Sequence, residues 1–250
     1  MLDLEVIGEG ATTKIYRDGS TAIKLYVNAP ADEADNEAER QRFARDAGLP
    51  VPEVYGVRRL DDGSVALDMA YIAGQPIIHP RMDKDERRNA IDTLVRLQCE
   101  VHQIHADPLP KLSDRLHWKI QTCPHLNEDL KAVLLALLTE LDDGSAQLCH
   151  GDMHTSNILY DGQKHWIIDW VDATAGNPLA DACRTYLIIK QYMSRSAGIY
   201  LNAFCKASNS NPSDILAWTP IIAAGRLREN LDDASRTWLL DMIHDWYNNR

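Results

Sequence analysis

The spacing of hydrophobic residues along the chain changes near residue 74. Before this point, short apolar runs separated by turn signals such as Asp18-Gly19 predict strands. After it, apolar residues recur every three or four positions, which predicts helices. Strands are expected at 4–8, 14–16, 20–26, 53–59 and 64–70, and a charged surface helix at 32–46. Helices are expected at 83–105, 128–141 and 179–206 and on to the C-terminus, with a strand-like island at 147–170. The pattern predicts two domains, a β-rich part (1–73) and a helical part (74–250).

The composition is that of an ordinary globular protein. Hydrophobic residues make up 45% of the 250 residues and charged residues 25%, which excludes a disordered or fibrous chain. The formal net charge of −11 opposes binding to nucleic acid or to an anionic membrane surface. A cationic small-molecule partner suits this charge, although acidity also serves solubility alone.

Cysteine usage and hydropathy give an expected location. The five cysteines are scattered without a C-x-x-C pair, so we expect neither a disulfide framework nor a zinc site. The first residues lack the basic and apolar regions of a signal peptide, and the longest apolar run, 132–138, is too short to cross a bilayer. We expect a cytoplasmic protein with no membrane partner.

Two features of the N-terminal part suggest phosphate binding. Gly8 and Gly10 stand in a turn between strand arms, where glycine lets backbone N–H groups approach a phosphate, although such a turn is often only a turn. Lys24 lies inside an apolar strand, either at a solvent-facing edge or as a fixed ammonium beside nucleotide phosphates. A carboxylate of the following helix would hold that ammonium. Glu37 is the first candidate and Glu39 the second. The two acids face different sides of the helix, so both cannot point inward.

The segment 150–157 carries the most specific pattern. Asp152 and Asn157 have the D-x-x-x-x-N spacing of a phosphotransferase loop, in which the carboxylate is the catalytic base and the amide oxygen a Mg²⁺ ligand. Asp169 closes the next apolar run and is expected as a second Mg²⁺ ligand. As an alternative, His150, Asp152 and His154 could form the metal site of a hydrolase, but that leaves Lys24 and Asn157 unexplained.

On these motifs, the chain resembles the aminoglycoside phosphotransferase and choline-kinase-like family. The resemblance runs from about residue 4 to about 189 and also includes the segment 176–181, whose Asp181 is structural in the family pattern. It implies an α+β, protein-kinase-like bilobal fold with a small antiparallel β N-lobe, one helix in that lobe, and a larger helical C-lobe. It also implies ATP and Mg²⁺ as cofactors, and a linker in which Tyr71 and Ile72 meet the adenine.

The acceptor expected from this resemblance is a small alcohol. Only about ten residues follow Asp169 before the next helix, too few for a segment that grips a protein substrate. An aminoglycoside-type acceptor is favoured, with choline, ethanolamine or a sugar as alternatives, followed by a non-catalytic nucleotide-binding module. The acceptor's identity, the choice between ATP and GTP, and the oligomeric state stay open. The C-terminal acids are interpreted as a solvated face or as cation-binding groups: Glu229, Asp232, Asp233, Asp241 and Asp245.

Overall fold

The computed structural model describes residues 4–10, 13–27, 30 and 32–250. The chain divides into two compact units. The first comprises Met1–Arg81 and Thr155–Ala173, and the second comprises Met82–His154 and Thr174–Arg250. These units differ from the expected ranges 1–73 and 74–250, because a segment from the middle of the chain returns to the first unit.

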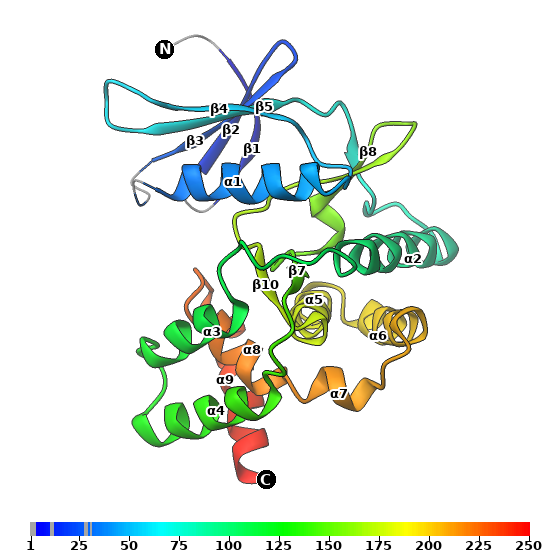
Figure 1. Cartoon of the computed structure of the whole chain (residues 1–250). Helices are drawn as coiled ribbons and strands as arrows, with labels where there is room; N and C mark the ends of the chain where they lie inside the picture. Colours follow the sequence, from blue (N-terminus) through cyan, green and yellow to red (C-terminus); the bar gives the residue numbers. More distant parts are fainter. Residues whose placement is uncertain (1–3, 11–12, 28–29, 31) are drawn as a thin grey trace. The chain divides into compact units, whose positions relative to one another are not determined.

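An antiparallel sheet of five strands forms most of the first unit (Figure 1). Its strands are β1 (Glu5–Glu9), β2 (Thr13–Asp18), β3 (Thr21–Tyr26), β4 (Val54–Arg59) and β5 (Val65–Ala70). Their order in the sheet is β1-β2-β3-β5-β4. The one helix of Met1–Arg81 in the described part of the chain, α1 (Glu33–Asp46), packs against β4 and β5.

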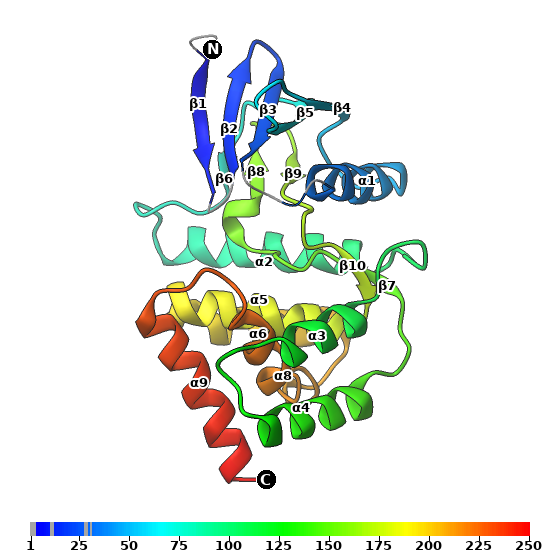
Figure 2. The same ribbon diagram turned by 90° about the vertical axis from the view of Figure 1, so that its left-hand side faces the viewer.

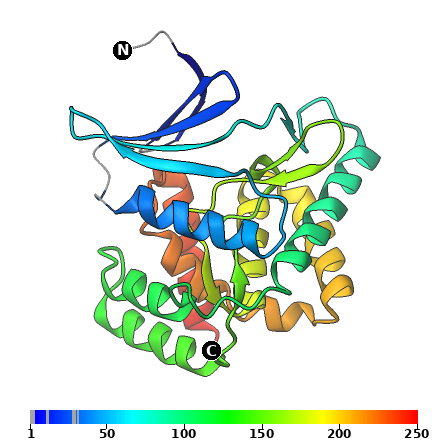
Figure 3. The same ribbon diagram turned by 45° about the horizontal axis from the view of Figure 1, so that its top comes forward.

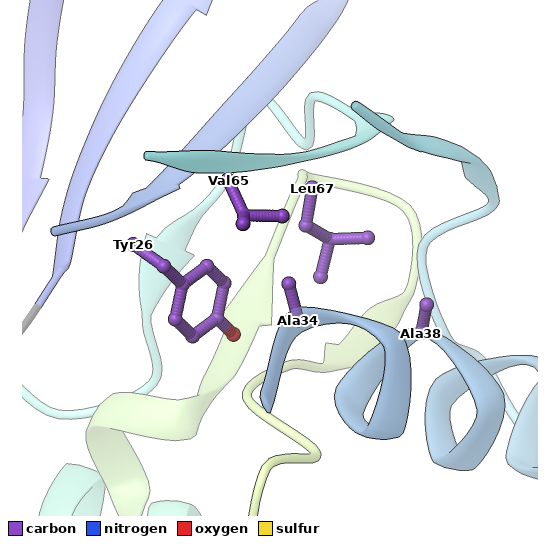
Figure 4. Close-up of a cluster of buried hydrophobic side chains, with 5 residues drawn as sticks. All are labelled: Tyr26, Ala34, Ala38, Val65 and Leu67. Atoms are coloured by element: carbon purple, nitrogen blue, oxygen red, sulfur yellow. The ribbon is translucent and has the colours of Figure 1, made fainter. Parts of the chain in front are cut away.

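Strand β3 shows why Lys24 faces inward. Successive side chains of a strand point to opposite faces, and in β3 the buried positions are Ala22, Lys24 and Tyr26. On the same side, α1 presents small side chains, so the helix comes close to the sheet. Figure 4 shows the resulting core, which consists of Tyr26, Ala34, Ala38, Val65 and Leu67.

The returning segment Thr155–Ala173 forms a hairpin in the first unit. Its strands β8 (Ile158–Tyr160) and β9 (His165–Ile167) pair with each other, and β8 also pairs with β6 (Gln75–Pro76). The Ile167 N–H donates to the Pro50 carbonyl at 2.8 Å, which ties the hairpin to the chain after α1. The expected strand-like island therefore contains this hairpin, which lies in the first unit.

The second unit is mainly helical (Figure 2). The helices are α2 (Lys84–Val101), α3 (Leu112–Gln121), α4 (Glu128–Leu141), α5 (Pro178–Tyr192), α6 (Ser194–Ser208), α7 (Pro212–Leu216), α8 (Thr219–Arg226) and α9 (Asp233–Asn248). Strands β7 (Gln147–Cys149) and β10 (Thr174–Gly176) pair antiparallel. Helix α2 packs against α6, and α5 packs against α6, α8 and β7. Helices α3 and α4, drawn in green, lie side by side (Figure 3).

The fold class expected from the sequence is confirmed, and the structure adds two details to its elements. The helical region expected at 179–206 consists of two helices: Met193 has φ −142° and ψ 54°, so α5 ends there and α6 begins at Ser194. Helix α3 was not expected, because its charged and aromatic residues mask the apolar stripe of Leu116 and Ile120. In the described part of the chain, no helix has the length and apolarity that a bilayer crossing requires.

Candidate functional site

The first unit contains a buried ammonium held by two carboxylates. Lys24 Nζ lies 2.9 and 2.8 Å from the two carboxylate oxygens of Glu37 and 2.8 Å from Asp169 Oδ1. Lys24 is 6% exposed and Glu37 1%, whereas the Asp169 side chain is 37% exposed. We call Lys24, Glu37 and Asp169 the lysine cluster. Of the two acids proposed as partners, Glu37 makes the contact and Glu39 is exposed on the surface of α1.

The position of Glu37 follows from the buried stripe of α1. Ala34, Ala38 and Gln41 lie one turn apart on this helix and are buried with Glu37. The Tyr26 hydroxyl donates a further hydrogen bond to Glu37. Burial alone would lower the pKa of Lys24, but the adjacent carboxylates outweigh it and hold that pKa above its usual value. Lys24 is therefore a permanent cation at physiological pH.

Two oxygen-bearing side chains lie at one end of the β8–β9 hairpin. Asn157 comes directly before β8, and Asp169 follows β9 after one intervening residue. Ile158 pairs with Ile167, and beyond that pair the Ile168 N–H donates to the Asn157 carbonyl at 3.0 Å. The hairpin register thus brings these two segments together.

The backbone at Asp169 is unusual. Its φ of 66° is in the left-handed region, which non-glycine residues seldom occupy and which Asp tolerates better than most. Trp170 beside it is fully buried and donates its indole N–H to the Ile167 carbonyl at 3.1 Å. The packing of Trp170 holds the backbone at Asp169 in place, and the Asp169 carboxylate stays partly exposed.

The chemistry of these donors fits a magnesium ion. Mg²⁺ prefers oxygen ligands and is usually bound through one or two carboxylates together with substrate phosphates. Asn157 offers an amide oxygen, and Asp169 offers a carboxylate that is both accessible and beside the Lys24 ammonium. The lysine cluster carries two carboxylates for one ammonium, so an added cation would reduce its excess negative charge.

The predicted phosphate turn and adenine linker also lie in the first unit. The Gly10 N–H donates to the Thr13 carbonyl at 2.8 Å, and a Cβ at Gly10 would come within 2.9 Å of Thr13 Oγ1. Gly8 stands opposite Ile15 in β1. Tyr71 and Ile72 follow β5. The Tyr71 N–H donates to the Ser20 carbonyl at 2.8 Å, so this group is already used within the protein.

Asp152, the expected base, belongs to the second unit and has its own ionic partners there. Its carboxylate lies 3.3 Å from His154 Nε2 and 3.4 Å from Arg184 Nη2. Burial would raise the pKa of Asp152, but the hydrogen bond from His154 and the charge of Arg184 outweigh it and hold that pKa well below its usual range. The carboxylate is therefore ionised at neutral pH, as a proton acceptor must be.

Helix α5 also holds the backbone beside Asp152. Gly151 has φ 79°, and its N–H donates to Asp181 Oδ1 at 2.8 Å. The other Asp181 oxygen accepts from Gln98 at 3.1 Å and contacts His102 Nε2 at 2.9 Å. Burial would raise the pKa of Asp181, but the hydrogen bonds from His102, Gln98 and Gly151 lower it. Asp181 is thus a buried anchor for this loop.

The C-terminal acids are partly used inside the protein. Glu229 contacts Arg184 and Arg226, so it pairs with two cations. Asp232 accepts from the Ser235 N–H at 2.7 Å as the N-cap of α9. Asp233 and Asp241 are exposed, as are most polar residues of α9. The interpretation as a solvated face therefore suits α9, whereas Glu229 belongs to a partly buried ionic network with two arginines.

The metallohydrolase alternative finds no support in the structure. Among the residues that the structure describes, no group of three or more His, Cys, Asp or Glu side chains is arranged to hold a metal ion. His150, Asp152 and His154 all lie within those residues. The zinc-type ligand set considered from the sequence is therefore not formed.

A comparison with protein-family models matches residues 3–217 of the chain to the phosphotransferase enzyme family. The chain belongs to the phosphotransferase enzyme family. The resemblance drawn from the motifs is thereby confirmed, and the protein is an enzyme of the small-molecule kinase type. A search of the curated proteins found no match.

Solved structures show the same fold at low sequence identity. A thermostable mutant of aminoglycoside phosphotransferase APH(4)-Ia, in a ternary complex with ADP and hygromycin B, has a TM-score of 0.69 and 18% identity over 98% of this phosphotransferase and 92% of that chain. Choline kinase LicA from Streptococcus pneumoniae has a TM-score of 0.67 and 14% identity over 98% and 94% of the two chains. An APH(2") enzyme in complex with GDP and kanamycin also has 0.67 and 14%, over 100% and 94%. At these identities the likeness establishes the fold of the phosphotransferase.

Neither Arg184 nor Arg226 belongs to a motif that the sequence shows. Arg184 stands three residues after Asp181 on α5, and residues at this spacing share a helix face. That spacing could have placed an arginine beside the Asp152 loop. Arg226 gives no such signal, because it is the last residue of the apolar helix α8 and its contact with Glu229 depends on how the chain turns after that helix.

Proposed function

We propose that this phosphotransferase moves the γ-phosphoryl group of Mg·ATP to a hydroxyl group of a small molecule, with an aminoglycoside-type acceptor as the first candidate. The observation that supports it most is the lysine cluster. A buried ammonium fixed between the carboxylates of Glu37 and Asp169 is the arrangement with which a kinase holds nucleotide phosphates beside its metal. A solvent-facing structural lysine would not need two carboxylate partners.

In this proposal, the first unit binds the nucleotide. Lys24 contacts the phosphates, and Gly8 and Gly10 let the backbone approach them because these residues carry no side chain. The Gly10 N–H is already bonded to the Thr13 carbonyl, so it is not counted among the phosphate donors. The adenine edge meets the Tyr71 carbonyl and the Ile72 N–H, since the Tyr71 N–H is already bonded to Ser20.

Asn157 and Asp169 would hold Mg²⁺, which when bound supplies positive charge that stabilises the transferring phosphoryl group. Asp152 accepts the proton of the attacking hydroxyl. The lowered pKa keeps Asp152 ionised. Its carboxylate can therefore accept a hydrogen bond from the attacking hydroxyl, which orients the hydroxyl oxygen, and then take the proton. No covalent intermediate with the protein is required.

The acidic character of the chain supports a cationic acceptor. The net charge of −11 would raise the local concentration of a polycationic aminoglycoside or of an amino alcohol. The names of the similar structures include both kinds of enzyme. A neutral sugar would gain nothing from this field.

The test is a screen for release of ADP from Mg·ATP, or of GDP from Mg·GTP, in the presence of aminoglycosides, choline, ethanolamine, macrolides and simple sugars. We expect a cationic acceptor to stimulate ADP release and to become phosphorylated, as seen by mass spectrometry. Asp152→Asn should lower kcat by about 10²- to 10⁴-fold while nucleotide binding is retained. Acceptor phosphorylation that survives in Asp152→Asn would refute the role of Asp152. If only neutral sugars are phosphorylated, the cationic acceptor class is wrong.

A further inference from the structure

Two side chains of helix α5 hydrogen-bond to the backbone of Gly151, one at its N–H and the other at its carbonyl. Asp181 accepts from the Gly151 N–H at 2.8 Å, and Arg184 donates from Nε to the Gly151 carbonyl. The two side chains are three residues apart, so they leave the same face of α5. One helix therefore fixes both the donor and the acceptor of the residue that precedes Asp152.

Arg184 also reaches the Asp152 carboxylate and a second acid. Its Nη2 lies 3.4 Å from Asp152 Oδ1, and its Nη1 donates to Glu229 Oε1. The Arg184 side chain is largely buried, at 13% exposed. A guanidinium has donors that point in several fixed directions within one plane, so a single arginine can make these three contacts together.

Glu229 is itself held in place by a second arginine. Arg226 Nε lies 3.2 Å from Glu229 Oε2, and Arg226 Nη2 donates to Gln191 Oε1 at 2.8 Å. Gln191 lies near the end of α5 and donates to Ser235 Oγ of α9 at 2.8 Å. We call Asp152, Arg184, Glu229 and Arg226 the arginine chain. It links the Asp152 loop through α8 back to α5 and to α9.

We propose that Arg184 is a positioning residue for the base, which holds the Asp152 carboxylate in one orientation and is itself held by Glu229 and Arg226. This inference rests on the proposed function, because it assigns Arg184 a part in the same phosphoryl transfer. The orientation matters because the carboxylate must accept a proton along one direction, and a displacement of about 1 Å can cost roughly 10²-fold in rate. A two-point contact to Gly151 and Asp152 restricts rotation of the side chain.

The test compares Arg184→Lys and Glu229→Gln with the wild type, and Arg195→Lys, an exposed position on α6, is the matched control. An ammonium retains the charge but cannot make the three contacts together. We expect Arg184→Lys to lower kcat for ADP release by about 10- to 100-fold with KM for ATP nearly unchanged, and Glu229→Gln to lower kcat less. Arg184→Lys keeps the positive charge, so its melting temperature should stay close to that of the wild type. Glu229→Gln removes the carboxylate charge that pairs with the buried Arg226, so its melting temperature should fall further.

Hydrogen exchange at residues 150–152 supplies a readout that needs no acceptor. In Arg184→Lys, the amides of Gly151 and Asp152 should exchange several-fold faster, whereas Arg195→Lys should leave them unchanged. If both kcat and this exchange match the wild type in Arg184→Lys, the inference is wrong. It is also wrong if kcat falls only together with a rise in KM for ATP, because that pattern reports nucleotide binding.

Failure of the proposed function has a different signature. The wild type would then release no ADP with any acceptor or with water, and Mg·ADP would not bind in calorimetry. Faster exchange in Arg184→Lys would in that case show only that Arg184 holds the loop, and the assignment to a base would be overturned together with the function.

Discussion

The lysine cluster and the arginine chain are two ionic networks that differ in charge balance. In the first unit, the single ammonium of Lys24 faces the two carboxylates of Glu37 and Asp169. In the second unit, the arginine chain pairs two guanidinium groups with two carboxylates. The arginine chain is thus neutral within itself, whereas the lysine cluster keeps a negative excess on the partly exposed Asp169.

This difference teaches where each network can act. A neutral, closed network fixes geometry, because all of its charges are already paired. A network with excess negative charge next to an accessible carboxylate still favours an added cation. The lysine cluster therefore suits binding of a metal–nucleotide complex, and the arginine chain suits orientation of a side chain.

The largest effect is expected from Lys24→Met, which removes the only cation of the lysine cluster. Glu37 would become a buried charge with no ammonium beside it, and loss of one partner of a buried ion pair costs about 3–5 kcal/mol. We expect the free energy of unfolding in urea to fall by that amount. Adding Glu37→Gln to Lys24→Met should recover part of the loss. Equal stabilities of the single and the double variant would contradict the pairing.

A smaller but more specific effect is expected from Asp169→Asn. Asparagine tolerates the left-handed backbone at this position, so the fold should be retained while the accessible negative charge is lost. The affinity for ADP in the presence of Mg²⁺ should fall by about 10- to 100-fold, as happens when groups that support a metal are removed.

Calorimetry with MgCl₂ and with EDTA separates the metal from the nucleotide in that variant. In EDTA, wild type and Asp169→Asn should bind ADP equally weakly. If Mg²⁺ raises the affinity for ADP as much in Asp169→Asn as in the wild type, Asp169 is not a metal ligand. The excess negative charge of the lysine cluster would then not serve metal binding.

The second unit should show its own dependence on pH through Asp181. Its pKa is lowered in the folded protein, so in the unfolded protein it takes up a proton at higher pH, near its usual value of about 3.9. The stabilising contribution of Asp181 is therefore complete at neutral pH. It is lost as the pH falls through the pKa of the unfolded protein and then through the lower pKa of the folded protein. We expect Asp181→Asn to lower the free energy of unfolding at pH 7 by about 1–3 kcal/mol.

Urea unfolding of both proteins between about pH 3 and 7 checks the sign of this effect. The difference between wild type and Asp181→Asn should shrink as the pH falls. A difference that grows toward low pH would mean that the Asp181 pKa is raised and that His102 and Gln98 do not stabilise its charge.

The smallest effect is expected from Glu39→Gln. Glu39 is an exposed residue of α1, two positions after the buried Glu37. Its substitution should change the free energy of unfolding by less than about 0.5 kcal/mol and leave nucleotide affinity unchanged. A loss as large as that of Glu37→Gln would mean that the choice between the two acids has been made incorrectly.

Local patterns gave most of the architecture of the first unit. The strand and turn signals predicted its sheet, and the charged segment at 32–46 predicted α1. The helices of the second unit are harder to predict from the sequence. Helix α3 carries only a short apolar stripe, and the break between α5 and α6 contains neither Gly nor Pro. That break depends on packing of α6 against both α2 and α5.

The sequence by itself determined which residues are candidates for the chemistry and the face on which several of them lie. The alternation of side chains along β3 places Lys24 on the same side as Ala22 and Tyr26. The spacing between Asp152 and Asn157 can be read directly from the sequence. Backbone geometry over a few residues is enough for such inferences.

Only the tertiary structure decided which of these residues meet. Lys24 and Asp169 are 145 positions apart, and Arg184 and Glu229 are 45 apart, so no local period relates them. Their contacts depend on hairpin register, on helix packing and on the large cost of leaving a charge buried without a partner. For that reason, Glu37 rather than Glu39 meets Lys24, and Glu229, which was considered for a cationic ligand, instead pairs with two arginines.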